Sequence, residues 1–290
     1  MHILRPLFIL IATLTAFGGV SSPAAAAESY DACVGFIDAL PAVITTQGIW
    51  CLRQNLDTSA ASGNMIDIQT NNVTIDCNGF RIRGSGGGAS TTAVGIFANS
   101  RLNLAIRYCT IRGFQVGIAL IDGSDYIVEN NLLDQSRFTG IEISGAGGVV
   151  RRNTIVNTAG SPAASLAYAI SAKGDIIDNV VDSVFGADSV VDFTAVGIYS
   201  PTDAGINFGM VIQGNRIRNL TPKGTGEAIG ILSSGSGVAV RDNAIGQASS
   251  TTGFGIACYN ATSHVRDNVI RNYVTGIQVG CDNAGGNSVD

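Results

Sequence analysis

The stretch from Val116 to Asp134 reads VGIALIDGSDYIVENNLLD and contains two units that recur along the chain. The first unit is a small residue, usually Gly, followed by Ile. The second is an Asn followed two residues later by an aliphatic residue. Within each unit apolar and polar residues alternate, which is the period of a β-strand and not of an α-helix. Short strands in a brief repeat cannot bury their apolar side alone, so we expect successive repeats to stack.

The two units return at intervals of 21 to 36 residues, as solenoid repeats do. The Gly–Ile unit begins at Gly95, Gly117, Gly140, Ala169, Gly197, Gly230, Gly255 and Gly276. The Asn unit begins at Asn131, Asn153, Asn179, Asn215, Asn243 and Asn268, with Asn78 and Cys109 at equivalent places in earlier repeats. Stacking predicts that each Ile points inward and that Gly admits a tight corner before the strand. Each Asn should adopt a left-handed backbone at a turn and bond to the Asn of the next repeat.

These units resemble those of the right-handed parallel β-helix repeat proteins, the pectate-lyase-like superfamily. The resemblance covers about Asn72 to the C-terminus, and Val43–Gly84 is similar to the first rungs of exported bacterial members. It implies an all-β fold, a single right-handed parallel β-helix of about eight to nine rungs with a short N-terminal cap. The superfamily holds lyases, hydrolases, epimerases, phage spikes and adhesins, so the fold does not fix the function.

The expected organisation is a signal peptide over residues 1–27, a cap segment over 28–56 and the β-helix domain over 57–290. Arg5 precedes the apolar run Leu7–Val20, and small residues end at Ala27, where we place the cleavage. The run is too short for a membrane anchor, and no later stretch reaches spanning length. We therefore expect a secreted or periplasmic protein, with a short helix in the cap sequence ESYDACVGFIDAL (residues 28–40).

The six cysteines fit export, because disulfides persist in oxidising compartments. Nearest-neighbour pairing is the simplest arrangement, and buried free thiols are the alternative. It joins Cys33 to Cys51, Cys77 to Cys109 and Cys258 to Cys281. The chain has no Cys-x-x-Cys pair and only two His, which argues against a zinc site.

Composition narrows the ligand class. The chain of 290 residues is 46% hydrophobic and 13% charged, which excludes intrinsic disorder. Its net charge of −5 offers no basic face for nucleic acid. Polysaccharide remains as the partner that the family resemblance implies, and the oligomeric state stays open.

Candidate site residues follow from the stacking. Three consecutive repeats carry insertions at one corner, and we expect these to form a wall beside a binding face. They are Thr158–Tyr168, Ser183–Ala195 and Asn219–Ala228. The residue after each Ile should face solvent, which places Glu142, Ser171 and Tyr199 on neighbouring rungs, with Lys173 close by. Glu142, Lys173 and Tyr199 could abstract a proton or bind sugar, and an ordinary solvated strand face is the alternative.

A second candidate surface is the charged column that precedes the Asn units. Arg107, Glu129 and Arg151 lie on successive rungs there. Arg107 and Arg151 could bind the carboxylates of an acidic polysaccharide. The structural alternative, which we favour, is a ladder of ion pairs between rungs.

No complete catalytic motif is present. Polygalacturonase-type hydrolysis is disfavoured, because the chain lacks an Asp-Asp pair and a Gly-His-Gly motif, and His264 is its one His after the leader. We expect no cofactor: calcium would suit a lyase, but the aspartates between Asp175 and Asp192 form no clear ligand cluster. Two hypotheses stand, and whether the protein is an enzyme is left open. One is an exported protein that binds polysaccharide and, as a lyase-type relative, processes it. The other is a non-catalytic adhesive or envelope solenoid.

Overall fold

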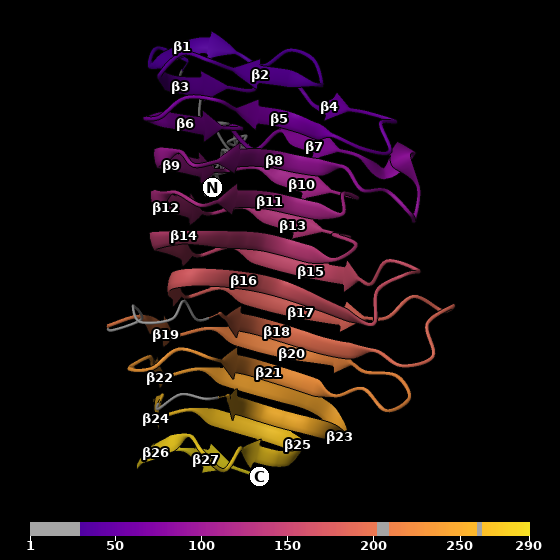
Figure 1. The fold of residues 1–290 in the computed structure, drawn as a ribbon, viewed down its shortest axis with the longest axis vertical. Helices are drawn as coiled ribbons and strands as arrows, with labels where there is room; N and C mark the ends of the chain where they lie inside the picture. Colours follow the sequence, from indigo (N-terminus) through magenta and orange to yellow (C-terminus); the bar gives the residue numbers. More distant parts are fainter. Residues whose placement is uncertain (1–29, 202–208, 260–262) are drawn as a thin grey trace, which may run out of the picture.

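The computed structural model describes residues 30–201, 209–259 and 263–290, and the predicted signal peptide lies outside them. The described residues form a 27-stranded parallel arrangement and one short 3₁₀ turn, η1 (Ser85–Gly87). The strands coil into a right-handed solenoid of about nine turns. Figure 1 shows the coils stacked along the long axis, from β1 at one end to β27 at the other. The predicted all-β parallel β-helix is therefore confirmed.

Each coil contributes to three parallel sheets, which we call sheets I, II and III. Sheet I contains β2 (Ala42–Ile44), β5 (Asn64–Ile68), β8 (Val94–Asn99), β11 (Val116–Ile121), β18 (Thr194–Ser200) and β21 (Ala228–Ser233). Sheet II contains β1 (Cys33–Phe36), β3 (Gly48–Cys51), β6 (Val73–Asp76), β9 (Leu102–Arg107), β12 (Ser124–Glu129), β19 (Val211–Gln213), β22 (Ala239–Arg241), β24 (His264–Arg266) and β26 (Asp282–Gly285). Sheet III contains β4 (Leu56–Asp57), β7 (Arg81–Arg83), β10 (Thr110–Arg112), β13 (Leu132–Asp134), β15 (Thr154–Ala159), β17 (Val180–Phe185), β20 (Arg216–Thr221) and β27 (Ser288–Val289).

Four long strands pass from one sheet into the next. β14 (Thr139–Arg151) and β16 (Leu166–Ile177) each run from sheet I into sheet II. β23 (Ala244–Cys258) and β25 (Val269–Ile277) each run from sheet III into sheet I. These continuous strands fix the relative position of adjacent sheets within a coil.

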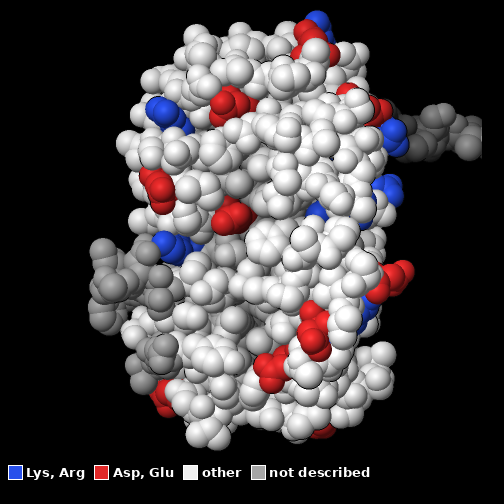
Figure 2. All heavy atoms as spheres, turned by 45° about the vertical axis from the view of Figure 1, so that its right-hand side comes forward, with Lys and Arg blue, Asp and Glu red and all other residues white. Residues whose placement is uncertain are grey.

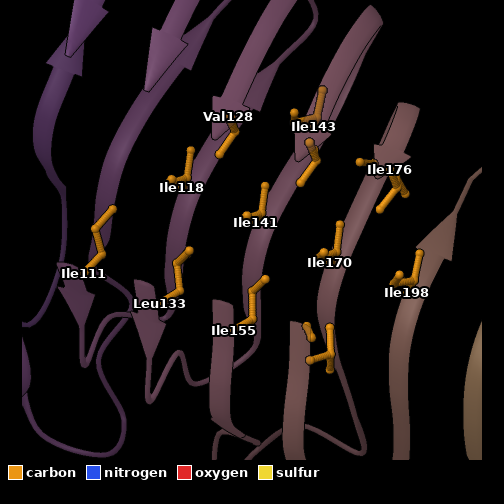
Figure 3. Packing of buried hydrophobic residues seen from close by; sticks show 14 of the residues in the cluster. Ile111, Ile118, Val128, Leu133, Ile141, Ile143, Ile155, Ile170, Ile176 and Ile198 are labelled. Atoms are coloured by element: carbon orange, nitrogen blue, oxygen red, sulfur yellow. The ribbon is translucent and has the colours of Figure 1, made fainter. Parts of the chain in front are cut away.

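The recurrent isoleucines line the interior, as predicted. Seven of them are fully buried: Ile96, Ile118, Ile141, Ile170, Ile198, Ile231 and Ile256. Ile277, in the last coil, is partly buried against the same core. Figure 3 shows the isoleucines of neighbouring coils in equivalent positions, with apolar side chains of the other sheets turned toward the same interior. Burial of one such side chain contributes about 1.5–3 kcal/mol, so the column is a main source of stability.

The glycine before each isoleucine has a different role from the predicted one. None of these glycines has a positive φ, so the expected tight corner is wrong. A Cβ on Gly140 would instead lie 2.5 Å from the carbonyl oxygen of Ala169 on the next coil. A Cβ on Gly197 would likewise lie 2.6 Å from the carbonyl oxygen of Gly230. The coils therefore approach so closely at this column that a side chain does not fit at most positions.

The predicted asparagine ladder is present at the corner between sheets II and III. The Asn179 side-chain oxygen accepts hydrogen bonds from the backbone N–H and the Nδ2 of Asn153, at 2.9 and 3.0 Å. Asn179 Nδ2 donates in turn to the Asn215 oxygen at 3.0 Å. The ladder runs through Asn131, Asn153, Asn179, Asn215, Asn243, Asn268 and Asn287. Cys109 occupies the preceding step, where its N–H donates to Asn131.

The left-handed residue at this corner is not the ladder asparagine but the residue before it. Arg152 and Asp178 have φ values of 54° and 56°, whereas Asn153 and Asn179 have no positive φ. The prediction was thus wrong by one position, except at Asn78, which has a φ of 49°. The preceding residue turns the chain, which leaves the ladder asparagine aligned with its neighbours on adjacent coils.

The N-terminal segment contains strands, and the short helix predicted for it is wrong. β1 (Cys33–Phe36) pairs in parallel with β3 (Gly48–Cys51). Gly35 admits the ring of Trp50, because a Cβ at this position would lie 2.6 Å from the ring. Pairing with β3 and close approach of the Trp50 ring, and not the local sequence, therefore account for the extended strand.

Three disulfides join neighbouring coils toward the two ends of the solenoid. They are Cys33–Cys51, Cys77–Cys109 and Cys258–Cys281, the pairs that nearest-neighbour pairing predicts. Among the described residues no helix is long and apolar enough to cross a membrane.

Candidate functional site

The outer face of sheet I brings three of the predicted site residues together. Glu142 is directly opposite Ser171 on the next coil, and Ser171 is opposite Tyr199 on the coil after that. All three follow an inward isoleucine, so the alternation of the strand turns them outward. Each is half-buried, which shows that neighbouring side chains cover this face. The prediction that these residues occupy neighbouring rungs is confirmed.

A second outward column lies beside the first and was missed by sequence reasoning. It contains the residue before each Gly–Ile unit, with Thr139, Tyr168 and Val196 on successive coils. Val196, Ile229 and Ala257 form a small apolar cluster that is separate from the interior core. We call the whole surface the outer patch, and it consists of Phe138, Glu142, Leu166, Tyr168, Ser171, Val196, Tyr199, Ile229, Leu232, Phe254 and Ala257.

Aromatic rings form the centre of the outer patch. The rings of Tyr168 and Tyr199 stack with a centroid distance of 5.1 Å and an interplanar angle of 20°. Phe138 meets Tyr168 edge to face at 6.2 Å. Such pairs contribute about 0.5–1.5 kcal/mol beyond their buried area, so they hold the rings in fixed orientations. The result is an aromatic platform that extends over three successive coils.

The carboxyl group of Glu142 borders this platform. Burial raises the pKa of Glu142 above its ordinary value. Burial also raises the pKa of Tyr168, with smaller contributions in the same direction from the charges of Tyr199 and Glu142. Within residues 30–201, 209–259 and 263–290, no hydrogen bond or ion pair involves the Glu142 side chain. A carboxylate that is partly removed from water without a partner has acceptor capacity for a ligand.

The three predicted insertions stack into a wall beside the outer patch. They correspond to residues 160–165, 186–193 and 222–227, between sheets III and I. Phe193 and Lys223 exchange two backbone hydrogen bonds, both of 3.0 Å. These contacts confirm the prediction of a wall, and Figure 1 shows the loops after β15 and β17 projecting from one side of the solenoid.

Polar contacts hold the wall together. Asp192 accepts hydrogen bonds from the backbone N–H and the hydroxyl of Thr225, and these two bonds lower the pKa of the Asp192 carboxyl. Lys223 donates to the carbonyl oxygen of Ala187 at 2.6 Å. The charged groups of Asp192 and Lys223 therefore form hydrogen bonds within the wall.

A pocket of about 430 Å³ lies where the first insertion meets the aromatic platform. Its lining residues come from the wall and from the edge of sheet I: Gln115, Phe138, Ser161, Ala163, Ala164, Ser165 and Leu166. Phe138 and Leu166 belong to both the pocket and the outer patch. The pocket and the patch therefore adjoin each other through these two residues.

The other predicted ligand-binding residues lie elsewhere. Arg107 and Arg151 are on sheet II, where they pair with Asp76 and Glu129, both at 2.8 Å. This is the ion-pair ladder of the structural alternative, and it separates the two arginines from Glu142. Lys173 lies two residues beyond Ser171 on β16, toward sheet II.

The aspartates considered as calcium ligands do not gather at one place. Among the described side chains, no group of three or more His, Cys, Asp or Glu residues could hold a metal ion. Two of the aspartates considered as calcium ligands have other partners, since Asp175 accepts from the Val211 N–H and Asp182 pairs with Arg218.

Comparison with known proteins agrees with the fold. A family model described as a right handed beta helix region matches residues 92–290, whereas no curated protein matches the chain. Among solved structures, a tailspike protein mutant of Escherichia coli bacteriophage HK620 in complex with a hexasaccharide has a TM-score of 0.43 and 13% identity, over 88% of this chain and 53% of that chain. An alginate lyase from Paenibacillus sp. FPU-7 has a TM-score of 0.40 and 12% identity, over 81% and 92%.

A double mutant of the same tailspike has a TM-score of 0.48 and 11% identity, over 86% of this chain and 56% of that chain. The chain thus spans about half the length of the tailspike proteins that it matches. With TM-scores below 0.5, these likenesses carry no argument about this chain, and the family assignment rests on the family model. The family model covers well over half of the chain, from the third coil of sheet I to the last residue, and the protein therefore belongs to the right-handed β-helix family.

Proposed function

We propose that this protein binds polysaccharide at the outer patch of sheet I. The observation that carries the proposal is the stacked pair of Tyr168 and Tyr199 near Glu142, whose carboxyl group has no hydrogen-bond or ion-pair partner among the described residues. A sugar ring has an apolar C–H face and a rim of hydroxyl groups. The aromatic platform matches the face, and a carboxylate and a serine hydroxyl match the rim.

The length of the outer patch along sheet I favours a polymer over a single sugar. The patch follows sheet I across several coils, and coils repeat about every 4.8 Å. One sugar residue spans roughly one coil, so the platform and the adjoining pocket could hold several consecutive residues of a chain. The wall of insertions bounds this track on one side.

The groups of the outer patch support binding of a polysaccharide more than cleavage of its bonds. Glycoside hydrolysis typically uses two carboxyl groups about 5 to 10 Å apart. Within the outer patch, as defined by its described residues, Glu142 is the one carboxyl group. A lyase-type reaction would need a base and a group that neutralises the substrate carboxylate, and the patch has no cation for the second role.

We also propose that the protein acts outside the cytoplasm, after removal of residues 1–27. The three disulfides support this location, because such bonds persist in oxidising compartments and are rare in the cytosol. The apolar leader of the sequence supports it independently.

The test is binding of immobilised and soluble polysaccharides by Tyr168→Ala and Tyr199→Ala variants of the full chain. Loss of one stacking ring should weaken binding about tenfold, because ring contacts are worth roughly 1 kcal/mol or more. Tyr108→Ala is the matched control, since Tyr108 is an exposed tyrosine on another side of the solenoid. Equal losses of affinity in all three variants, or no loss in the two outer-patch variants, would refute polysaccharide binding at the outer patch.

A further inference from the structure

The charge of the outer patch is unusual for a surface that would bind an acidic polymer. Its described members include one carboxyl group, Glu142, and neither Lys nor Arg. Figure 2 shows the molecule turned to bring the insertion side forward, and its charged side chains lie singly or in small groups on a mostly uncharged surface. An anionic ligand at the patch would therefore meet a carboxylate without a compensating cation.

The lysines on the neighbouring part of β16 and on the wall, Lys173 and Lys223, have interactions of their own. Lys173 is two residues beyond Ser171, roughly 7 Å further along the strand. Lys223 of the wall is bonded to the Ala187 oxygen and lies 3.5 Å from an Asp188 oxygen. The dominant influence on the pKa of Glu142 is burial, which raises it, whereas a close cation would lower it.

The arginines that could recognise a carboxylate are on another face. Arg107 and Arg151 of sheet II hold Asp76 and Glu129 in ion pairs. A polymer lying on the aromatic platform would not reach these guanidinium groups, because they belong to a different side of the coil.

We infer that the outer patch selects an uncharged glycan, and that Glu142 determines this specificity by accepting hydrogen bonds from sugar hydroxyls and repelling uronate carboxylates. The inference rests on the proposed function and names its ligand class. A carboxylate forms stronger hydrogen bonds to neutral hydroxyl donors than an amide does. The same charge, partly removed from water, acts against a second carboxylate nearby.

The experiment compares wild type with Glu142→Gln, which keeps the side-chain shape and removes the charge. Titration calorimetry would use a soluble glucan, a galactomannan and a xylan as neutral probes, and polygalacturonate and alginate as acidic probes. We expect wild type to prefer a neutral probe. Glu142→Gln should bind that probe about tenfold more weakly and the acidic probes about tenfold more tightly.

The matched control is Asp67→Asn. Asp67 lies in the same outward column of sheet I, three coils before Glu142 and roughly 14 Å away, so it reports any general effect of removing one negative charge. Asp67→Asn should leave both affinities within twofold of wild type. A similar gain for acidic probes in both variants would overturn the role of Glu142.

The outcomes separate this inference from the proposed function. Wild-type preference for polygalacturonate or alginate, with binding lost in Tyr199→Ala, would overturn the neutral-glycan inference and leave the binding site in place. Absence of any Tyr199-dependent binding across the five probes would overturn the proposed function, and the inference with it.

Discussion

Truncation of one central ladder asparagine should destabilise the solenoid strongly. Asn179→Ala removes an oxygen that accepts from the Asn153 N–H at 2.9 Å and an amide that donates to the Val150 oxygen at 2.9 Å. Asn179 is fully buried, so water cannot replace these bonds in the folded protein. The backbone N–H of Asn153 and the carbonyl of Val150 would each lose a partner.

The expected magnitude follows from these two groups. A buried polar group left without its hydrogen bond costs about 1–3 kcal/mol, so the variant should lose about 2–6 kcal/mol of unfolding free energy. Asn287→Ala, at the half-buried last step of the ladder, should lose only about 1 kcal/mol, because water reaches the freed groups. Asn99→Ala, on an exposed strand end, should stay within about 0.5 kcal/mol of wild type.

The assay is guanidinium chloride unfolding followed by circular dichroism, with the midpoint and the slope fitted together. Solenoids can unfold coil by coil, so an unchanged slope is needed before the midpoint is read as a change in stability. A loss below about 1 kcal/mol for Asn179→Ala, or equal losses for Asn179→Ala and Asn99→Ala, would refute the claim that the ladder holds the corner between sheets II and III.

Two further predictions concern stability. Because burial raises the folded-state pKa of Glu142 above its ordinary value of 4.5, the unfolding free energy should fall as pH rises through the interval between the two pKa values. Glu142→Gln should therefore raise the Tm at pH 7 and leave it unchanged at pH 3, and a gain that is equal at both pH values would contradict this account. Gly197→Ala places a Cβ 2.6 Å from both the Gly230 oxygen and Ile217, and should cost about 1–3 kcal/mol in thermal unfolding. Its control is Gly246→Ala, whose nearest neighbour is 3.9 Å away and whose Tm should not fall.

The repetitive sequence predicted the architecture well, because each repeat shows the same pattern of buried and corner residues. An inward isoleucine such as Ile141 and a corner asparagine such as Asn153 recur with the same local pattern, so errors at one repeat are corrected by the others. The N-terminal segment has no such redundancy. Its strand depends on tertiary contacts with β3, such as the contact between Gly35 and Trp50, that a local pattern does not reveal.

The candidate site was predictable only in part. The outward positions of Glu142 and Tyr199 follow from strand alternation. Tyr168 was missed because the glycine unit interrupts this alternation, so that the residues before Gly and after Ile both face outward, as Val196 and Tyr199 do. The stacking of Tyr168 on Tyr199 further depends on how two coils align, which is set by backbone pairing between distant residues.

The most direct test of the account is a crystal structure of the protein soaked with a neutral oligosaccharide. We expect an ordered sugar ring over Tyr168 and Tyr199, with a hydroxyl about 2.6–3.2 Å from a carboxylate oxygen of Glu142. An ordered sugar along Arg107 and Arg151 on sheet II, with the outer patch empty, would contradict it.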